Sequence, residues 1–381
     1  MFRVTAIPKT MRAVVYRGVN DLRLETVPVP RTGANELLVK VAVCGVCPTD
    51  IKKIHYGTVP PPRIFGHETA GTIVKIGGGN SPNTRNSKFK IQNLKIGDRV
   101  ALHHHVPCLD CHYCRHHAFA QCETYKRTGI TAGFEPAGGG YAEYVRVLPF
   151  VLPGVVKIPA KNSFEEGAML EPVNTVLKAV RRLELLRGDI VLVAGQGPIG
   201  LMFTRLLKIA GMKVLGTDLL ASRLKLARKY GANRAVLANQ LSTPNSQLRI
   251  DAAIIAVPSD AVVTQALQLV RGAGKVLLFA HTKRAEVRSQ KSEVRKPSFN
   301  LQPLTFNLDL ASVCLDEKDL VGSYSSDFTL QREVARLVFS RQLDVRSLIT
   351  HRFPLAETSA AIALAARPTE ASLKIVVNVG E

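Results

Sequence analysis

The second half of the chain alternates short apolar segments with segments of helical periodicity. From about residue 173 onward, apolar runs such as "DIVLVAG" and "AAIIAV" predict buried strands. Segments such as "IGLMFTRLLKIAG" and "SRLKLARKYGA" have the apolar spacing of helices. Strands that alternate with helices predict an α/β fold built on a parallel, doubly wound sheet. The segment "DAVVTQALQLVRGAG", residues 260–274, is expected to form one of the helices, and "DLVGSY" is expected to supply a sixth strand. The polar stretch 282–318 before that strand is expected to be a loop with weak local structure.

A glycine motif lies in the first strand–helix connection of this region. The segment "VAGQGPIG" places Gly195, Gly197 and Gly200 as G-x-G-x-x-G after a predicted strand and at the start of a predicted helix. The first glycine permits the tight turn, the second lets the backbone approach a pyrophosphate, and the third lets the helix pack closely on the strand. Pro198 and Ile199 stand between Gly197 and Gly200, at the start of the predicted helix. The N-terminus of a helix offers free N–H groups to phosphates. The motif therefore predicts a dinucleotide-binding site.

The acidic residue that follows this motif indicates which dinucleotide is preferred. Asp218 ends the next predicted strand, eighteen residues after Gly200. A carboxylate there can bind both ribose hydroxyls, and it would repel a 2′-phosphate. The sequence therefore favours NAD over NADP. Arg223 leaves NADP as the weaker alternative, because a nearby arginine could accommodate that phosphate.

Four of the seven cysteines lie in the segment "CLDCHYCRHHAFAQC", spaced C-x2-C-x2-C-x7-C. An odd total in a reducing compartment argues against a disulfide framework. Two-residue gaps suit thiolates that converge on one ion, and four cysteines make a tetrahedral structural zinc site. Without a ligand, four reactive thiols would be crowded together. We predict that this four-cysteine lobe holds a structural zinc ion through Cys108, Cys111, Cys114 and Cys122.

The net charge and the N-terminus bear on partners and location. The formal charge is +21, and its densest patch, residues 282–296, is interrupted by two glutamates and contains no aromatic residue. Because a base-stacking platform is not visible, no nucleic-acid partner is expected. The N-terminal segment has no signal-peptide pattern, and no apolar run is long enough to span a membrane. We therefore expect a cytoplasmic protein without a membrane partner.

A second group of candidate metal ligands lies in the first half of the chain. Cys47 in "CGVCPTDIKK" and His67 in "FGHETAG" are twenty residues apart at predicted strand ends. Each has a neighbouring acid, Asp50 and Glu68 respectively. A cysteine, a histidine and a carboxylate around an open position are typical of a catalytic zinc site. The carboxylate could come from Glu68 or from the more distant Glu171, and the sequence leaves both open.

These motifs occur together and in a specific order: "GVCPTD", "GHE", "GDRV", the four-cysteine lobe, "EP" and "GQGPIG". From Met11 onward, nearly the whole chain resembles the zinc-dependent medium-chain alcohol dehydrogenases, in their polyol and threonine dehydrogenase-like branch. The resemblance implies a GroES-like, β-rich catalytic domain over residues 1–172. It also implies a Rossmann domain over 173–324 and a C-terminal segment, 325–381, that returns to the catalytic domain.

The resemblance further implies roles for individual residues. Cys47 and His67 would bind a catalytic zinc ion, completed by Glu68 or Glu171. Thr49 would hold the hydroxyl of a proton relay, and Asp50 would orient a ligand. One position departs from the family pattern, because Lys52 stands where many members carry a relay histidine.

The activity implied is reversible hydride transfer from a small alcohol to NAD+, in a homodimer or homotetramer. The alcohol would be a polyol, a secondary alcohol or an amino alcohol. One alternative is a catalytically inactive or regulatory protein that kept the fold, although the intact ligand set weighs against it. Another is a dehydrogenase of an acidic or phosphorylated sugar, which the positive charge would suit.

Overall fold

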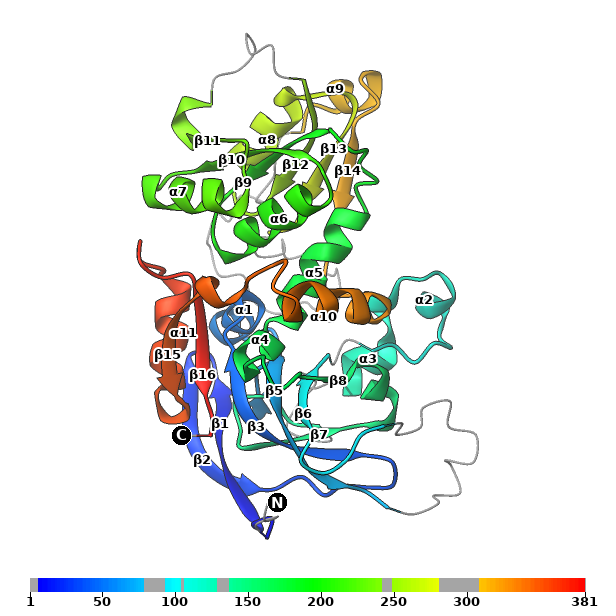
Figure 1. The fold of residues 1–381 in the computed structure, drawn as a ribbon, viewed down its shortest axis with the longest axis vertical. Helices are drawn as coiled ribbons and strands as arrows, with labels where there is room; N and C mark the ends of the chain where they lie inside the picture. The colour runs from blue at the N-terminus through cyan, green and yellow to red at the C-terminus, as the bar shows by residue number, and fades with distance from the viewer. Residues whose placement is uncertain are drawn as a thin grey trace, which may run out of the picture. The chain divides into compact units, whose positions relative to one another are not determined.

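The computed structural model describes residues 6–78, 93–103, 106–128, 137–241, 249–280 and 308–380 (Figure 1). The chain divides into two compact units. The first unit comprises Met1–Lys178 and Tyr324–Glu381, and the second comprises Ala179–Ser323. The sequence placed these boundaries after residues 172 and 324. Within the described residues, no helix combines the length and the apolar character needed to cross a bilayer.

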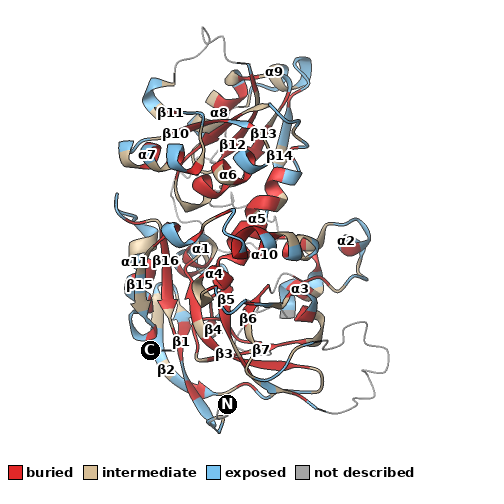
Figure 2. Ribbon diagram, in the orientation of Figure 1, coloured by how far each residue is buried: buried red, intermediate tan, exposed pale blue. Residues whose placement is uncertain are grey.

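The first unit is built on a seven-stranded sheet in the order β15-β16-β3-β5-β6-β8, with β7 also paired to β3. Its central strand, β3, has the sequence "LLVKVAVCG" and is buried along most of its length, as Figure 2 shows for the middle of this sheet. The last strand of the chain pairs antiparallel with β3, so the C-terminal tail lies in the first unit. A smaller sheet has the order β2-β1-β4. The strands of this unit are β1 Thr10–Gly18, β2 Asp21–Pro28, β3 Leu37–Gly45, β4 Arg63–Ile64, β5 Glu68–Ile76, β6 Arg99–Leu102, β7 Tyr144–Val147, β8 Val156–Lys157, β15 Ile349–Pro354 and β16 Lys374–Asn378.

Helix α1 follows β3 after two residues and shows how local sequence sets an element's bounds. Cys47 is its N-cap, Pro48 occupies the first helical position, and Gly57 ends it in the left-handed conformation at φ +60°. Proline at N1 and glycine after the last turn are the residues that these positions favour. The helices that begin in this unit are α1 Pro48–Tyr56, α2 His112–Arg115, α3 Glu123–Thr128, α4 Phe164–Ala168, α5 Leu170–Arg181, α10 Gln331–Phe339 and α11 Thr358–Ala366.

The second unit is a six-stranded sheet in the order β11-β10-β9-β12-β13-β14, and every neighbouring pair is parallel. Its strands carry the apolar runs that the sequence identified, and they form a separate hydrophobic core. The predicted α/β class and the sixth strand are therefore confirmed. The elements are β9 Ile190–Ala194, α6 Pro198–Ile209, β10 Lys213–Asp218, α7 Ala221–Tyr230, β11 Arg234–Leu237, β12 Ile250–Ile255, α8 Asp260–Leu269, β13 Val270–Leu278, α9 Leu310–Leu315 and β14 Asp319–Gly322.

Three local expectations from the sequence were wrong or incomplete. The helix expected over 260–274 ends at Leu269, because Val270 pairs with Ile250 and begins β13. A short helix, α9, lies in the polar stretch 282–318, which the sequence predicts to be a loop with weak local structure. The side chain of Asp309 caps this helix by accepting from the Ser312 N–H at 3.2 Å. Strand β15 was not anticipated. The basic stretch 282–296 lies outside the described residues, and so does most of the polar segment 77–93, which the sequence predicts to be a surface loop or insertion.

Candidate active site and metal centres

Among the described residues, two groups of side chains bring three or more possible metal-ligand atoms within 4.8 Å of one another. One is the four-cysteine lobe, and the other comprises Cys47, His67 and Glu68. Both groups consist of residues that the sequence singled out. The dinucleotide loop lies in the second unit and is treated separately below.

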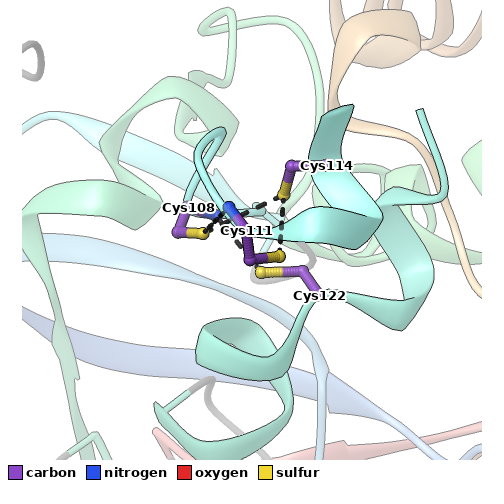
Figure 3. Close-up of side chains that lie close together, drawn as sticks. All are labelled: Cys108, Cys111, Cys114 and Cys122. Carbon is purple, nitrogen blue, oxygen red and sulfur yellow. Dashed lines mark hydrogen bonds between the residues drawn. The ribbon is translucent and has the colours of Figure 1, made fainter. Parts of the chain in front are cut away.

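The lobe sulfurs point toward a common centre (Figure 3). The Sγ atoms of Cys111 and Cys114 are 3.5 Å apart, and those of Cys108 and Cys114 are 3.9 Å apart. Four thiolates at about 2.3 Å from one zinc ion, in a tetrahedron, would be about 3.8 Å apart. A disulfide would require about 2.05 Å, and all four cysteines are free. The spacing of the sulfurs therefore fits a zinc ion.

The electrostatics of the lobe also favour a bound cation. Backbone N–H groups of Cys111 and Cys108 donate to the sulfurs of Cys108 and Cys122, at 3.4 and 3.3 Å. Burial alone would raise the pKa of Cys108, but donors that include the Asp110 and Cys111 N–H groups lower it to about 6. Burial and the neighbouring thiol of Cys111 raise the pKa of Cys114 to about 12. Four thiolates cannot accumulate here without a positive charge among them, which zinc would supply.

The lobe is anchored to the first unit by aromatic packing. Tyr125 is buried against the cysteines, and Phe119 packs beside them. The ring of Phe119 meets that of Phe328 edge to face, with centroids 5.4 Å apart. Phe328 belongs to the segment that re-enters the first unit after Ser323. The lobe thus contacts the start of the returning tail.

The second group assembles where two neighbouring strands meet their connections. Cys47 follows the end of β3, and His67 immediately precedes β5, which Glu68 opens. Because β3 and β5 are antiparallel and Gly45 pairs with Glu68, these ends lie together. The Sγ of Cys47 also accepts the N–H of Thr49 at 3.5 Å. Residues twenty apart in sequence are therefore brought within ligand distance of one another.

Asp50 fixes the orientation of the His67 ring. Oδ1 of Asp50 lies 3.1 Å from Nδ1 of His67, and both side chains are buried. Because an ionised carboxylate only accepts, Nδ1 carries the proton and Nε2 is left as the possible metal ligand. Burial opposes both charges, but the pKa of Asp50 is lowered by the imidazole. The pKa of His67 is raised well above its ordinary value by Asp50 and Cys47. A thiolate, an imidazole and a carboxylate are a donor set that fits zinc.

A buried lysine, Lys374 at the start of β16, contacts this group. Its Nζ donates to Oε1 of Glu68 at 2.6 Å and to the carbonyl of Val46 at 2.9 Å. Burial would lower the pKa of Lys374, but the negative charges of Glu68 and Cys47 raise it. Sequence reasoning missed this residue, because a single lysine before the apolar strand "KIVVN" has no pattern that marks it.

Glu171, the other candidate carboxylate, is buried in the first turn of α5 but is not one of the three converging ligands. The hydroxyl of Thr175 donates to its Oε1 at 3.4 Å. Burial raises the pKa of Glu171 to about 7, and the negative charge of Glu68 adds to this rise. The positive charges of His67 and Lys374 act in the opposite direction. Glu171 therefore interacts electrostatically with the group from outside it.

The sequence predicts that Cys44, in β3, is a buried packing residue and that the run His103–His105 is structural or exposed, so that neither is expected to bind a metal. Cys44 is fully buried, and burial raises its pKa to about 12, in keeping with a packing role. His103 is buried too, and its Nε2 lies 3.5 Å from the Ser326 hydroxyl. His104 and His105 lie outside the described residues. The pKa of Lys52, on α1, is lowered by burial, although the charge of Cys47 opposes this.

The glycine loop has the conformation that its motif predicts. Gly195 has φ +93°, in the left-handed region. A Cβ on Gly200 would lie 1.8 Å from the carbonyl oxygen of Gly195, so only glycine fits there. Gly197 is the N-cap of α6, which continues with Pro198 and Ile199. The loop therefore directs the free N–H groups of a helix N-terminus toward the carboxyl end of β9.

The two charged residues near this loop are held in different ways. Asp218 ends β10, and its carboxylate oxygens accept the N–H groups of Gln196 at 2.7 Å and Leu220 at 3.0 Å. Arg223 is buried, and its Nη1 lies 3.5 Å from the position that a Cβ on Gly197 would occupy. The carboxylate is therefore fixed beside the loop, and the guanidinium packs against the loop itself.

Comparison with known proteins gives consistent matches over the whole chain. The model of the alcohol dehydrogenase GroES-like domain matches residues 33–160, and that of the zinc-binding dehydrogenases matches residues 198–338. A sorbitol dehydrogenase of Bombyx mori is 29% identical over 96% of this chain and 98% of its own. A sorbitol dehydrogenase of Bacillus subtilis is 27% identical over 97% of this chain and 98% of its own.

Solved structures agree. An alcohol dehydrogenase from Thermus sp. ATN1 is 27% identical, with a TM-score of 0.78 over 97% of this chain and all of its own. A zinc-binding dehydrogenase from Sinorhizobium meliloti shares the fold, with a TM-score of 0.81 at 24% identity over 98% of this chain and 100% of its own. With the converging ligands and the glycine loop, these matches show that the chain belongs to the zinc-dependent medium-chain alcohol dehydrogenase family, whose members are oxidoreductases that use zinc and NAD(P).

Proposed function

We propose that the chain catalyses the reversible oxidation of a small polyol or secondary alcohol, with NAD+ as the hydride acceptor. The observation that carries the proposal is the convergence of Cys47, His67 and Glu68 in a chain that also has a dinucleotide loop. The sorbitol dehydrogenases of Bombyx mori and Bacillus subtilis favour a polyol. An amino alcohol and a phosphorylated sugar are the competing substrates.

Two sets of residues would hold the cofactors. Cys47, His67 and a carboxylate, either Glu68 or Glu171, would hold the catalytic zinc, and the lobe cysteines would hold the structural one. When bound, the catalytic zinc supplies a Lewis acid that lowers the pKa of an alcohol hydroxyl, and NAD+ supplies the hydride acceptor.

The remaining work falls to the protein's own groups. Asp50 keeps Nδ1 of His67 protonated, which leaves Nε2 as the ligand atom. Thr49, two residues after Cys47 in the first turn of α1, would accept the hydroxyl proton of the substrate. Because Lys52 replaces the relay histidine, we propose that Lys52, three residues after Thr49, is the protein group that passes the proton on toward solvent.

A substrate panel tests the proposal. Sorbitol, xylitol, 2,3-butanediol, threonine and a hexitol phosphate would be offered to the zinc-loaded protein with NAD+, and NADH formation would be followed at 340 nm. We expect the highest kcat/KM with an uncharged polyol or diol. Failure to oxidise any of these compounds, in protein that binds NAD+ and zinc, would contradict the enzymatic assignment. A preference for the phosphate ester would select the phosphorylated-sugar alternative.

The preference for NAD over NADP is proposed from Asp218. Its carboxylate, held by two backbone N–H groups, would accept the ribose hydroxyls and repel a 2′-phosphate. Asp218→Ala should reduce the ratio of kcat/KM for NAD+ to that for NADP+ by about tenfold or more. A native enzyme that already prefers NADP+ would contradict this reading. Arg223→Ala serves as the comparison, because it removes the charge that could tolerate the phosphate.

We also propose that the protein assembles as a homodimer or homotetramer and works in the cytoplasm. The reducing environment there suits a lobe whose four cysteines must remain thiolates. Light scattering of the purified chain at several concentrations would test the assembly, and a purely monomeric protein would contradict it.

A further inference from the structure

Lys374 is a buried ammonium beside the proposed catalytic ligands. It is 5% exposed, although lysine is among the residues least often buried. Burying a charge is costly unless partners satisfy it. Here the partners are Oε1 of Glu68 and the carbonyl of Val46, at 2.6 and 2.9 Å. Val46 immediately precedes Cys47. Lys374 is therefore hydrogen-bonded both to the segment that carries Cys47 and to Glu68 itself.

The Glu68 carboxylate is in close contact with this ammonium and lies near the backbone of β3. The ammonium of Lys374 approaches both carboxylate oxygens. Gly45 of β3 also lies against the carboxylate, because a Cβ at this position would be only 1.8 Å from Oε2 of Glu68. The absence of a side chain at Gly45 thus makes room for the carboxylate, and Lys374 determines its direction.

The charges around Glu68 create a competition for it. A metal ion held by Cys47 and His67 and the ammonium of Lys374 would both be cations near one carboxylate. A carboxylate shared with an ammonium donates less charge to a metal than one that is free. A catalytic zinc site, unlike a structural one, must keep a position open for its substrate. Sharing Glu68 would serve that requirement.

We propose that Lys374 is a positioning residue of the catalytic metal centre: by holding Glu68, it limits how closely the carboxylate engages the ion and so preserves a coordination position for the alcohol. This inference rests on the proposed function, and it assigns a role in the metal centre to the C-terminal strand. It also accounts for a buried lysine that is 306 residues away from its partner in sequence.

Lys374→Met tests the proposal with a readout other than activity. Without the ammonium, Glu68 has the metal as its remaining cation and should bind it more closely. We expect chelator-driven release of zinc from the Cys47–His67 site to slow by about tenfold or more, because the Glu68 carboxylate, no longer shared with an ammonium, would hold the ion more tightly. With Co2+ in place of zinc, the visible absorption bands should shift, which reports a changed ligand set. The kcat should fall and the KM for the alcohol should rise.

Matched variants separate positioning from general support of the fold. Lys374→Arg keeps the charge and should restore the native release rate and Co2+ spectrum. Zinc in the four-cysteine lobe and the melting temperature are internal controls for folding. If Lys374→Met does not fold, Lys374→Gln, whose amide can still donate to Glu68, is measured in the same way. For Lys374→Gln we expect zinc to be released more slowly than from the native protein. The slowing should be smaller than the slowing of about tenfold expected when the contact with Glu68 is lost completely.

Several outcomes would overturn the inference. If Lys374→Met released zinc at the native rate or faster and its Co2+ spectrum were unchanged, Lys374 would have only a structural role. Slowing that persists fully in a Glu68→Gln background would show that Lys374 acts by its charge alone and not through Glu68. If the native protein itself held no metal that Cys47→Ser removes, the proposed function would fail, and this result is distinct from the other two.

Discussion

The four-cysteine lobe draws all its ligands from residues 108–122, whereas the Cys47–His67–Glu68 group draws its ligands from the ends of two strands. In the lobe, the cysteine sulfur atoms lie close to one another. Backbone N–H groups from the same short segment donate hydrogen bonds to them. In the second group, two of the ligands have a charged partner from another segment, Asp50 for His67 and Lys374 for Glu68.

Under the proposed function, this difference separates a structural zinc site from a catalytic one. Four equivalent thiolates saturate a tetrahedral ion and leave no position for a substrate. Three unlike ligands leave one position open, and their partners tune how strongly each ligand donates. The partners come from α1 and from the C-terminal strand β16, so the reactive group depends on the assembled fold. The lobe depends mainly on its own short segment.

The largest expected effect comes from Cys47→Ser. Removing the thiolate should lower kcat/KM by about a thousandfold or more, because a Lewis-acid metal contributes several kcal/mol to the barrier reduction. NAD+ binding, measured by calorimetry, should be nearly unchanged, and one zinc ion per chain should be lost. Cys44→Ser, at a buried thiol three residues away, is the matched control and should keep both ions. Full activity in a metal-verified Cys47→Ser protein would remove the distinction between the two groups.

An intermediate effect is expected from Cys114→Ser in the lobe. The lobe should no longer bind zinc when one of its cysteines is removed. The melting temperature should fall by about 2–4 °C for each kcal/mol of unfolding free energy that is lost. The zinc at Cys47 should remain, since the two groups share no ligand. Cys314→Ser, at an exposed cysteine outside both groups, should change neither zinc content nor stability. Metal analysis and calorimetry would check both variants, and unchanged zinc content in Cys114→Ser would argue against the lobe site.

The smallest expected effect is that of Phe119→Ala, which keeps all four lobe cysteines. It removes the edge-to-face contact with Phe328, and we expect a loss of about 1–2 kcal/mol in unfolding free energy. Zinc content should not change, because no ligand is altered. Tyr113→Ala, on the exposed side of the lobe, is the comparison and should cost less. If the lobe lost its zinc in Phe119→Ala, its independence from the rest of the fold would be disproved.

Local patterns explain what the sequence could predict. The spacing of the lobe cysteines, the glycine motif after a strand, and the alternation of strands with helices each lie within one short segment. The parallel sheet followed from the alternation of strands with helices, and the family followed from the order of six short motifs along the chain. The convergence of Cys47 with His67 was a weaker inference, since it required two predicted strand ends to be neighbours.

The partners of these residues could not be predicted in the same way. Lys374 pairs with Glu68 only because β16 lies beside β3 and β3 beside β5, a long-range arrangement that no short motif encodes. The end of α8 at Leu269 was missed for a similar reason, because Val270 is withdrawn from the helix by its pairing with Ile250. Tertiary pairing overrode helical periodicity in that segment.

Anomalous diffraction at the zinc edge from crystals of metal-loaded protein tests the central claim most directly. The account predicts two zinc peaks per chain: one surrounded by the sulfurs of Cys108, Cys111, Cys114 and Cys122, and one between Sγ of Cys47 and Nε2 of His67. A fully loaded crystal with the lobe peak alone, in which the side chains of Cys47 and His67 point away from each other, would contradict it.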